Sequence, residues 1–316
     1  MNFQKEAILD RARGALLGTA VADALGAGYE FEPPLAKETP VVFRSGAFDK
    51  GEWTDDTAMM ICIAKAASRS DLSQSLDDVA KEFYGWYASR PKDIGIQTRT
   101  ILSKLSDGSS AGDMLESSME FLAENERAAG NGSLMRTAAV ALPFLSQPEV
   151  LASVAEGVSS LTHHDLTCRE ACVIWTKAIR HAILFENFDG IQLAINELPA
   201  FRQGFWNDLL DEAERSEDPS EFVNNGWVIH ALQAAYKAIM MSSTNSPEHF
   251  RLGVEQAVRV GNDTDTVAAI AGALLGARWG YSAIPADWLQ ILHGWPALEA
   301  KDLVSLADQI TEPIWA

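Results

Sequence analysis

The chain has 316 residues, of which 47% are hydrophobic and 22% charged, and it carries a formal net charge of −19. This balance is typical of a soluble globular protein with a sizeable core, and the excess of acidic residues disfavours binding to nucleic acid or to an anionic membrane. Three cysteines, an odd number, argue against a disulfide framework, and no signal peptide or membrane-spanning run is evident, so we expect a cytoplasmic protein.

A helix is predicted over residues 8–25, and one side of it carries small side chains at every fourth position. The same pattern returns near the end of the chain; the two sets are Gly14, Gly18, Ala22 and Gly26, and Ala268, Gly272, Gly276 and Gly280. Because glycine costs helix stability, such ridges indicate that another backbone packs very close. We therefore expect the two helices to touch. An antiparallel crossing would bring Glu30 to the acids at 263–265.

The stretch Gly51–Thr57 places acids and hydroxyls at the start of a predicted helix over 54–68, after a loop with a short extended piece at 41–43. Thr54, Asp55 and Asp56 are compatible with a helix cap, because such side chains accept bonds from free N–H groups and suit the helix dipole. One cap of this kind would be ordinary. The motif is informative only together with a distant counterpart.

The middle of the chain has the 3.6-residue period of helices, with polar breaks such as Asp93–Thr98. Helices are predicted over 76–88, 99–105, 115–125, 151–161, 166–185, 227–241 and 247–260, and short helices in an acidic segment over 187–225. Strand alternation does not persist, and no internal repeat occurs. The sequence therefore predicts one all-α domain over residues 1–316, with ten or more helices around two acid-bearing helix ends.

The loop Gly130–Ser133 combines two glycines with an asparagine and leads into another helix. Glycines let backbone N–H groups approach a phosphate, and the following helix adds its positive end. A plain turn at a helix start would have the same composition. Both interpretations stay open on these residues alone.

His163 and His164 lie between two predicted helices. A neutral histidine in the core is as good an interpretation of His163 as a place in a ligand pocket. His164, Cys168 and Cys172 are spaced by four residues and would align on a helix as zinc ligands. No fourth ligand is evident, and buried reduced cysteines are common, so we do not expect zinc.

The counterpart of the first acid motif is Gly261–Thr266, again followed by a run of helix formers. If the two helix starts meet, four carboxylates repel one another at short range and need a cation between them. Ligands that are all oxygen favour Mg²⁺, Mn²⁺ or Ca²⁺ over zinc.

In order and approximate spacing, these motifs resemble those of the ADP-ribosylglycohydrolase family over nearly the whole chain. The resemblance rests on Thr54-Asp55-Asp56, on Gly130–Arg136, which matches a Gly-Asn-Gly-x-x-Met-Arg loop, and on Gly261–Thr266, which matches Gly-Gly-Asp-Thr-Asp-Thr. The chain departs from the family at Ala22 and at Asn262, where glycine is usual. Asparagine tolerates unusual backbone angles, so we expect the site to survive the second change.

The resemblance implies a compact all-α fold with two divalent cations, Mg²⁺ or Mn²⁺, at converging helix N-termini. The implied metal ligands are Thr54, Asp55, Asp56, Asp263, Asp265 and Thr266, with Asp265 bridging both ions. The catalytic candidates are Asp55, Asp56 and Glu30, the last matching a glutamate that gates substrate entry. The implied substrate-binding residues are Gly130, Asn131, Gly132, Ser133, His163 and Asp93. Arg136 is expected to hold a carboxylate within the site.

The implied activity is hydrolysis of the glycosidic bond between ADP-ribose and an acceptor, with an arginine linkage as the first expectation. The partners would be an ADP-ribosylated protein or small molecule, with a nucleic-acid acceptor disfavoured, and the protein is expected to be monomeric. The alternative is a non-catalytic ADP-ribose-binding or crystallin-like protein on the same scaffold. A third is a metal hydrolase acting on a different nucleotide. The complete set of metal-ligand residues favours an enzyme.

Overall fold

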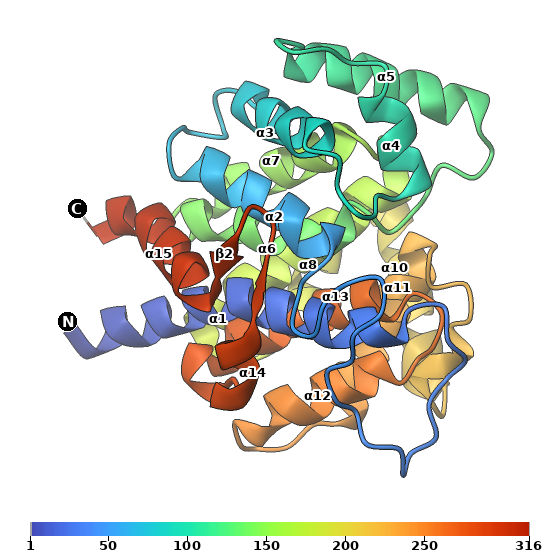
Figure 1. Ribbon diagram of the computed structural model, residues 1–316, viewed down its shortest axis with the longest axis vertical. Helices are drawn as coiled ribbons and strands as arrows, with labels where there is room; N and C mark the ends of the chain where they lie inside the picture. The colour runs from blue at the N-terminus through green and yellow to red at the C-terminus, as the bar shows by residue number, and fades with distance from the viewer. Residues whose placement is uncertain (1, 316) are drawn as a thin grey trace.

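The computed structural model describes residues 2–315, and most of this range is helical (Figure 1). Fifteen α-helices and six short 3₁₀ helices occur within it, with one antiparallel pair of two-residue strands, β1 His293–Gly294 and β2 Leu298–Glu299. The all-α prediction is confirmed. None of the helices in this range is long and apolar enough to cross a membrane.

The predicted helices occur in the expected order, with ends shifted by up to six residues, and α14 and α15 of the tail were not predicted. The α-helices are α1 Asn2–Gly26, α2 Asp55–Ala67, α3 Asp77–Ala88, α4 Ile96–Leu102, α5 Ala111–Glu124, α6 Ala138–Ala141, α7 Pro148–Ser160, α8 Leu166–Phe185, α9 Gly190–Asn196, α10 Ala200–Arg215, α11 Val228–Met241, α12 Glu248–Val258, α13 Thr264–Trp279, α14 Ala286–Ile291 and α15 Ala300–Thr311. The acidic segment contains one helix, α10, that is longer than predicted.

Residues 41–43 lie in the predicted loop and form no strand. The backbone of Val42 instead bonds the Tyr29 hydroxyl, which donates to the carbonyl oxygen and accepts from the N–H, both at 2.8 Å. The hydroxyl of the buried Tyr29 therefore satisfies both backbone polar groups of Val42 and fixes the loop between α1 and α2.

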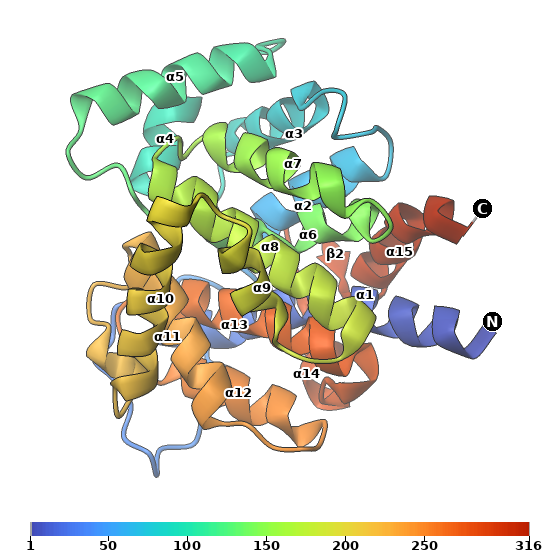
Figure 2. The same ribbon diagram turned by 180° about the vertical axis from the view of Figure 1, so that it is seen from behind.

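The antiparallel pair α1 and α13 lies at the centre of the molecule, and the two helices run side by side in both views (Figures 1 and 2). Gly14 faces Gly276, and Gly18 faces Gly272, so close that a Cβ on any of the four would overlap a carbonyl oxygen of the other helix. The predicted crossing of the two small ridges is confirmed. At its far end Gly26 contacts the backbone of Asp265, which brings the end of α1 to the start of α13.

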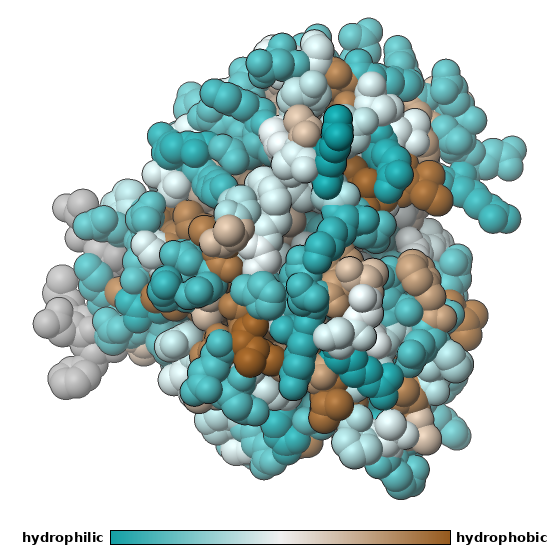
Figure 3. Space-filling model, in the orientation of Figure 1, coloured by the Kyte–Doolittle hydropathy of each residue, from teal (hydrophilic) through white to brown (hydrophobic). Residues whose placement is uncertain are grey.

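The other helices pack around this pair. Helices α8, α11 and α12 contact α13, while α2 and α15 contact α1. Buried apolar side chains form one continuous cluster that includes residues from Ile8 to Ile310; Trp288 of the tail belongs to it, and the partly buried Trp295 packs against it. The face of the molecule shown in Figure 3 is largely hydrophilic, in keeping with the charge of −19.

Replacing Gly272 with alanine is expected to lower the free energy of unfolding by about 1–3 kcal/mol, because the added methyl group must displace the backbone of α1. Gly85 in α3 provides a matched control, since a Cβ there meets no atom within 4 Å. Alanine at Gly85 should be neutral or stabilise by about 0.5–1 kcal/mol, the usual gain for leaving glycine in a helix. Urea unfolding of both variants tests the crossing, and equal stabilities would contradict it.

Candidate active site

The first acid motif lies at the N-terminus of α2, but its own side chains do not cap that helix. The cap comes from Asp23 of α1, whose carboxylate accepts hydrogen bonds from the N–H groups of Thr54 at 3.1 Å and Thr57 at 3.0 Å. The Thr54 hydroxyl donates instead to Asp56 Oδ2 at 3.1 Å. The capping interpretation of the motif therefore fails for Thr54, and Asp55 and Asp56 are left for another use.

The second acid motif begins α13 and meets the first. The Thr266 hydroxyl donates to Asp56 Oδ2 at 3.4 Å, and Asp263 Oδ2 accepts from the Asn131 side-chain amide at 2.8 Å. Asn262 has a positive φ of 57°, the left-handed conformation that asparagine tolerates better than most residues. Asn262 can therefore adopt the backbone conformation of the turn that precedes Asp263.

Carboxylate oxygens converge in two overlapping groups. Oxygens of Asp23, Asp56 and Asp265 lie within 4.8 Å of one another, and so do oxygens of Glu30, Asp263 and Asp265. Asp265 belongs to both groups. Asp56 Oδ1 is buried and has no hydrogen-bond partner. An unpartnered buried oxygen in an all-oxygen cluster fits a divalent cation such as Mg²⁺ or Mn²⁺.

The environment of the cluster opposes its negative charge. Burial, together with repulsion from Asp263 and Asp93, raises the pKa of Glu30 to about 8. Burial, with repulsion from Asp93, raises the pKa of Asp55 to about 7. Burial likewise raises the pKa values of Asp56, Asp263 and Asp265. So many acids held close together are stable as anions only when a positive charge compensates them.

These pKa shifts predict how stability depends on pH. A carboxyl group with a raised pKa binds more protons in the folded than in the unfolded protein, so stability falls as pH rises from about 4 towards the folded-state pKa values of about 7 and 8. Burial lowers the pKa values of His163, His164, His230 and His249, so these imidazoles oppose the trend only near and below their unfolded-state pKa of about 6.5. The melting temperature of the metal-free protein should therefore fall between about pH 7 and about pH 8.5.

Added Mg²⁺ or Mn²⁺ should restore the melting temperature, and the increment should be larger at the higher pH because the ligands are then ionised. Calorimetric or fluorimetric melts with chelator and with added metal measure this increment. The double variant Asp56→Asn and Asp265→Asn serves as the control and should respond much less. A melting temperature that does not change with Mg²⁺ or with Mn²⁺, at either pH, would contradict the proposed cation site.

Beside the cluster lies a cavity of about 490 Å³, formed between the two acid-bearing helix ends and the glycine loop. Its wall contains most of the residues that were expected to bind substrate, together with apolar side chains; they include Glu30, Asp55, Asp93, Gly130, Asn131, Gly132, His163, Asp263, Asp265, Thr266, Phe31, Ile96 and Phe121. The backbone of the loop is therefore exposed to the same space as the acids. A ligand with a diphosphate and a ribose could contact both.

Ser133 does not line this cavity, contrary to its predicted role in substrate binding. Its side chain is buried in the core, where its hydroxyl accepts a hydrogen bond from Ser159 at 3.0 Å. The thiol of Cys172 also donates to it, at 3.4 Å, and Cys168 donates to the Gly130 carbonyl oxygen at 3.3 Å. Both cysteines are free and buried, and each hydrogen-bonds the glycine loop, so they are core residues, as expected.

His163 lies under the glycine loop, where its ring packs against Gly130 and Gly132. Burial lowers the pKa of this imidazole well below its usual value, so it is neutral at pH 7. The Arg136 guanidinium donates to the Thr162 hydroxyl at 2.8 Å, and that oxygen lies 2.8 Å from His163 Nδ1. The Thr162 hydroxyl can then donate to Nδ1, which favours the tautomer with the proton on Nε2.

The expectation that Arg136 holds a carboxylate is wrong. Its side chain is fully buried, lies over the Phe83 ring at 4.4 Å and bonds the Val158 carbonyl oxygen and Thr162. This arginine positions His163 through Thr162 and does not contact the acids. The sequence assigns no role to Asp23, because its contact with α2 depends on how α1 and α2 pack.

A sequence model of the ADP-ribosylglycohydrolase family matches residues 4–315. The chain is 30% identical to the ADP-ribosylarginine hydrolase Tri1 of Pseudomonas putida (strain GB-1), over 97% of this chain and 81% of that protein. It is 27% identical to the ADP-ribosyl-(dinitrogen reductase) glycohydrolase of Rhodospirillum rubrum, over 90% of each.

A solved structure described as an ADP-ribosylglycohydrolase-related protein complex has the same fold, with a TM-score of 0.72 and 27% identity over 97% of this chain and 99% of that one. The family match spans almost the whole chain and includes both acid motifs and the glycine loop. This chain belongs to the ADP-ribosylglycohydrolase family.

Proposed function

We propose that the protein is a metal-dependent hydrolase that releases ADP-ribose from an ADP-ribosylated protein or small molecule, with arginine as the first acceptor to test. The observation that carries this proposal is the meeting of two acid-bearing helix ends, with the buried Asp56 Oδ1 unpartnered, at the wall of a cavity that also exposes the glycine loop. The names of two similar proteins, an ADP-ribosylarginine hydrolase and an ADP-ribosyl-(dinitrogen reductase) glycohydrolase, support the same activity.

The cations would be held by the hydroxyls and carboxylates at the two helix ends, namely Thr54, Asp55, Asp56, Asp263, Asp265 and Thr266. When bound, divalent cations supply positive charge that compensates these acids, orients ribose hydroxyls and polarises a water molecule. The glycine loop would hold the diphosphate through its backbone N–H groups. Asn131 already bonds Asp263, so the loop and the acids are positioned together.

In the reaction, the oxygen of one water molecule bonds to C1″ of the ribose as the bond from C1″ to the acceptor nitrogen breaks. One proton of the water passes to a carboxylate, and the released nitrogen takes up one proton, so one water is consumed for each bond broken. Asp55 and Glu30 are among the carboxylates that line the cavity, and the proposal assigns the exchange of these protons to a carboxylate among Asp55, Asp56 and Glu30. Carboxylates beside C1″ also stabilise the positive charge that develops on the ribose, as in glycosidases.

A panel of ADP-ribosylated compounds tests the proposal directly. The panel contains arginine-linked and serine-linked ADP-ribose, and released ADP-ribose is measured with Mg²⁺, with Mn²⁺ and with chelator. Release from the arginine-linked compound only in the presence of metal is the expected result. Tight ADP-ribose binding without turnover of any compound, at confirmed metal occupancy, would instead indicate a non-catalytic ADP-ribose-binding protein.

A further inference from the structure

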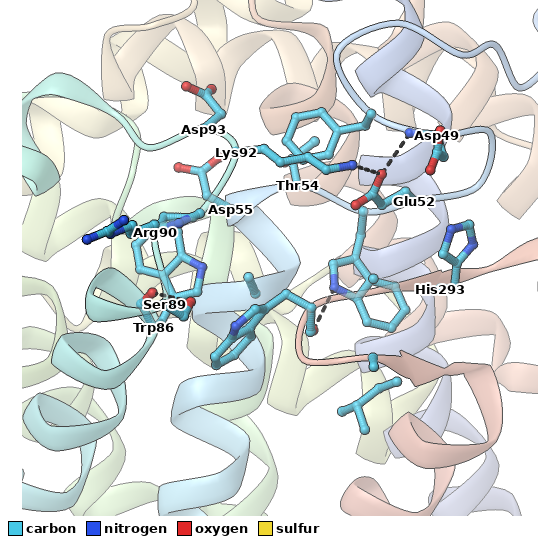
Figure 4. A pocket seen from close by; sticks show the side chains of 18 of the residues that line it. Asp49, Glu52, Thr54, Asp55, Trp86, Ser89, Arg90, Lys92, Asp93 and His293 are labelled. Atoms are coloured by element: carbon cyan, nitrogen blue, oxygen red, sulfur yellow. Dashed lines mark hydrogen bonds and ion pairs between the residues drawn. The ribbon is translucent and has the colours of Figure 1, made fainter.

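Two cavities other than the one that contains the glycine loop differ in how their polar side chains are bonded. The first, of about 590 Å³, lies between α2 and the turn that connects β1 and β2 (Figure 4). Its Lys92 ammonium group is already paired with Glu52 at 2.6 Å, and the Trp53 indole N–H donates to the Trp295 carbonyl oxygen at 3.1 Å. The other cavity, of about 520 Å³, is lined by donors that bond to no other described residue.

This cavity of about 520 Å³ is called the α7–α8 cavity below. It lies between α5, α7 and the loop that precedes α3, and the connection from α7 to α8 and the first turn of α8 complete its wall. Among the described residues, none lines both this cavity and the one that contains the glycine loop. The two are nevertheless close along the chain, because His164 lines the α7–α8 cavity and its neighbour His163 lies under the glycine loop.

Three donors on the wall of the α7–α8 cavity have no hydrogen-bond partner within residues 2–315. They are the hydroxyl of Ser160 at the end of α7, the imidazole of His164 and the guanidinium of Arg169. His164 Nδ1 and Arg169 Nε are themselves buried atoms. Buried polar atoms without a partner are rare and costly, and a bound ion or ligand is one of the usual reasons for them. Three such donors within ten residues of one another therefore indicate a ligand that supplies several acceptors.

The charges around the α7–α8 cavity favour an anion. Arg169 is half-buried and forms no ion pair with any described residue, although the chain has 44 acidic residues and only 25 lysines and arginines. Burial and the positive charge of Arg169 lower the pKa of His164, so the guanidinium lies close to this imidazole. The nearby Asp165 is engaged as the cap of α8, accepting from the N–H of Thr167 at 2.8 Å. Within the described wall only Glu156 carries a carboxylate, and it is exposed.

We propose that Ser160, His164 and Arg169 bind the phosphate group of a small ligand in the α7–α8 cavity, at a site separate from the candidate active site. A guanidinium donates strong, charge-assisted hydrogen bonds to phosphate oxygens, and the hydroxyl and the imidazole N–H add two further donors. A cavity of about 520 Å³ has the size of a small-molecule site, so a phosphate group leaves room for an organic part beside the apolar Leu76 and Leu115.

Arg169→Gln tests this site, with Arg99→Gln as the matched control. Arg99 is exposed on α4, has no side-chain partner among the described residues and does not line the α7–α8 cavity, so its substitution removes the same charge elsewhere. Inorganic phosphate and AMP are titrated calorimetrically into each protein in the presence of saturating ADP-ribose. We expect the parent and Arg99→Gln to bind at least one of these probes equally well, and Arg169→Gln to bind it at least about tenfold more weakly.

The two probes distinguish the sources of the phosphate group. Tighter binding of AMP than of phosphate would assign the cavity to a phosphorylated organic molecule, and the reverse order would assign it to free phosphate. A second variant, Glu156→Gln, changes the charge in the opposite direction on the exposed side of α7, where the fold is not disturbed. It should tighten binding about twofold, because an anion no longer meets this carboxylate.

The inference would be overturned if the parent bound neither probe, or if Arg169→Gln and Arg99→Gln bound the probes equally well. No turnover is measured in these titrations, so the result does not depend on the hydrolase activity proposed above. If ADP-ribose failed to bind, the proposed function would be in doubt, but loss of phosphate or AMP binding in Arg169→Gln alone would still place the ligand in the α7–α8 cavity.

Discussion

Replacing Asp56 with asparagine is expected to reduce the rate of ADP-ribose release by at least about two orders of magnitude, while ADP-ribose binding stays nearly unchanged. Asparagine has the same shape, and its carbonyl oxygen can still accept from the Thr54 and Thr266 hydroxyls that bond Asp56. What it lacks is the negative charge and the second carboxylate oxygen, Oδ1, which is buried without a partner. The change therefore acts on whatever cation the cluster holds and on the transition state that depends on it.

Substrate contacts away from the cluster should survive this change. The glycine loop and His163 line the cavity from elements other than α2, and neither hydrogen-bonds Asp56. Steady-state kinetics give the rate, and calorimetric titration with ADP-ribose gives the affinity. Asp208→Asn is a suitable control, because Asp208 is exposed on α10 and does not line the cavity that contains the glycine loop.

The same variant makes an opposite prediction for stability. Without metal, Asp56→Asn should be at least as stable as the parent, because it removes a carboxylate whose pKa is raised by burial and by repulsion from Asp23 and Asp55. With metal, it should gain less than the parent does. Near-normal turnover by Asp56→Asn would exclude the assigned role of this residue, whichever acceptor is used.

The parts of the fold that follow from regular spacing could be predicted from the sequence. Glycines at every fourth position cannot improve a helix by themselves, so two such ridges imply a partner backbone, and the contact of Gly18 with Gly272 is that partner. From this crossing alone Glu30 could be expected near Asp263 and Asp265. The distance between these residues in the chain is no obstacle, because each lies at a defined end of one of the two crossing helices.

Other features could not be predicted, because they depend on contacts between elements whose packing has no periodic signal. The role of Arg136 is one, since a buried guanidinium that bonds carbonyl and hydroxyl oxygens has the same sequence context as one that bonds a carboxylate. Ser133 is another, since adjacent residues of a tight loop can face opposite sides. The cavity between α2 and the turn that connects β1 and β2 is a third, since its wall combines residues as far apart as Trp53 and Trp295.

Asp23 is the clearest case in which packing assigns a role that the sequence leaves open. Its carboxylate accepts from the N–H groups of Thr54 and Thr57 and from the Thr57 hydroxyl, and all these groups are buried. Burial raises its pKa to about 6, against the opposing effect of those hydrogen bonds. Because its oxygens accept these hydrogen bonds, Asp23 fixes Thr54 and Thr57 and thereby positions Asp55 and Asp56, which lie between them. Asp23 itself does not line the cavity that contains the glycine loop.

Asp23→Ala is therefore expected to lower the free energy of unfolding by about 1–3 kcal/mol at saturating Mg²⁺, because buried donors at the start of α2 lose their acceptor. The rate of ADP-ribose release should fall about a hundredfold, since a small displacement of Asp55 and Asp56 is enough to misalign the site. Asp23→Asn keeps an oxygen that can accept from Thr57 and should retain most of the stability and the rate. Urea unfolding and steady-state kinetics of the two variants distinguish the effect of the Asp23 hydrogen bonds from the effect of its negative charge.

Two outcomes would contradict this role. If Asp23→Asn were as damaging as Asp23→Ala, the negative charge of Asp23 would be essential, and this residue would belong among the cation ligands. If Asp23→Ala were harmless, α2 would not need this cap.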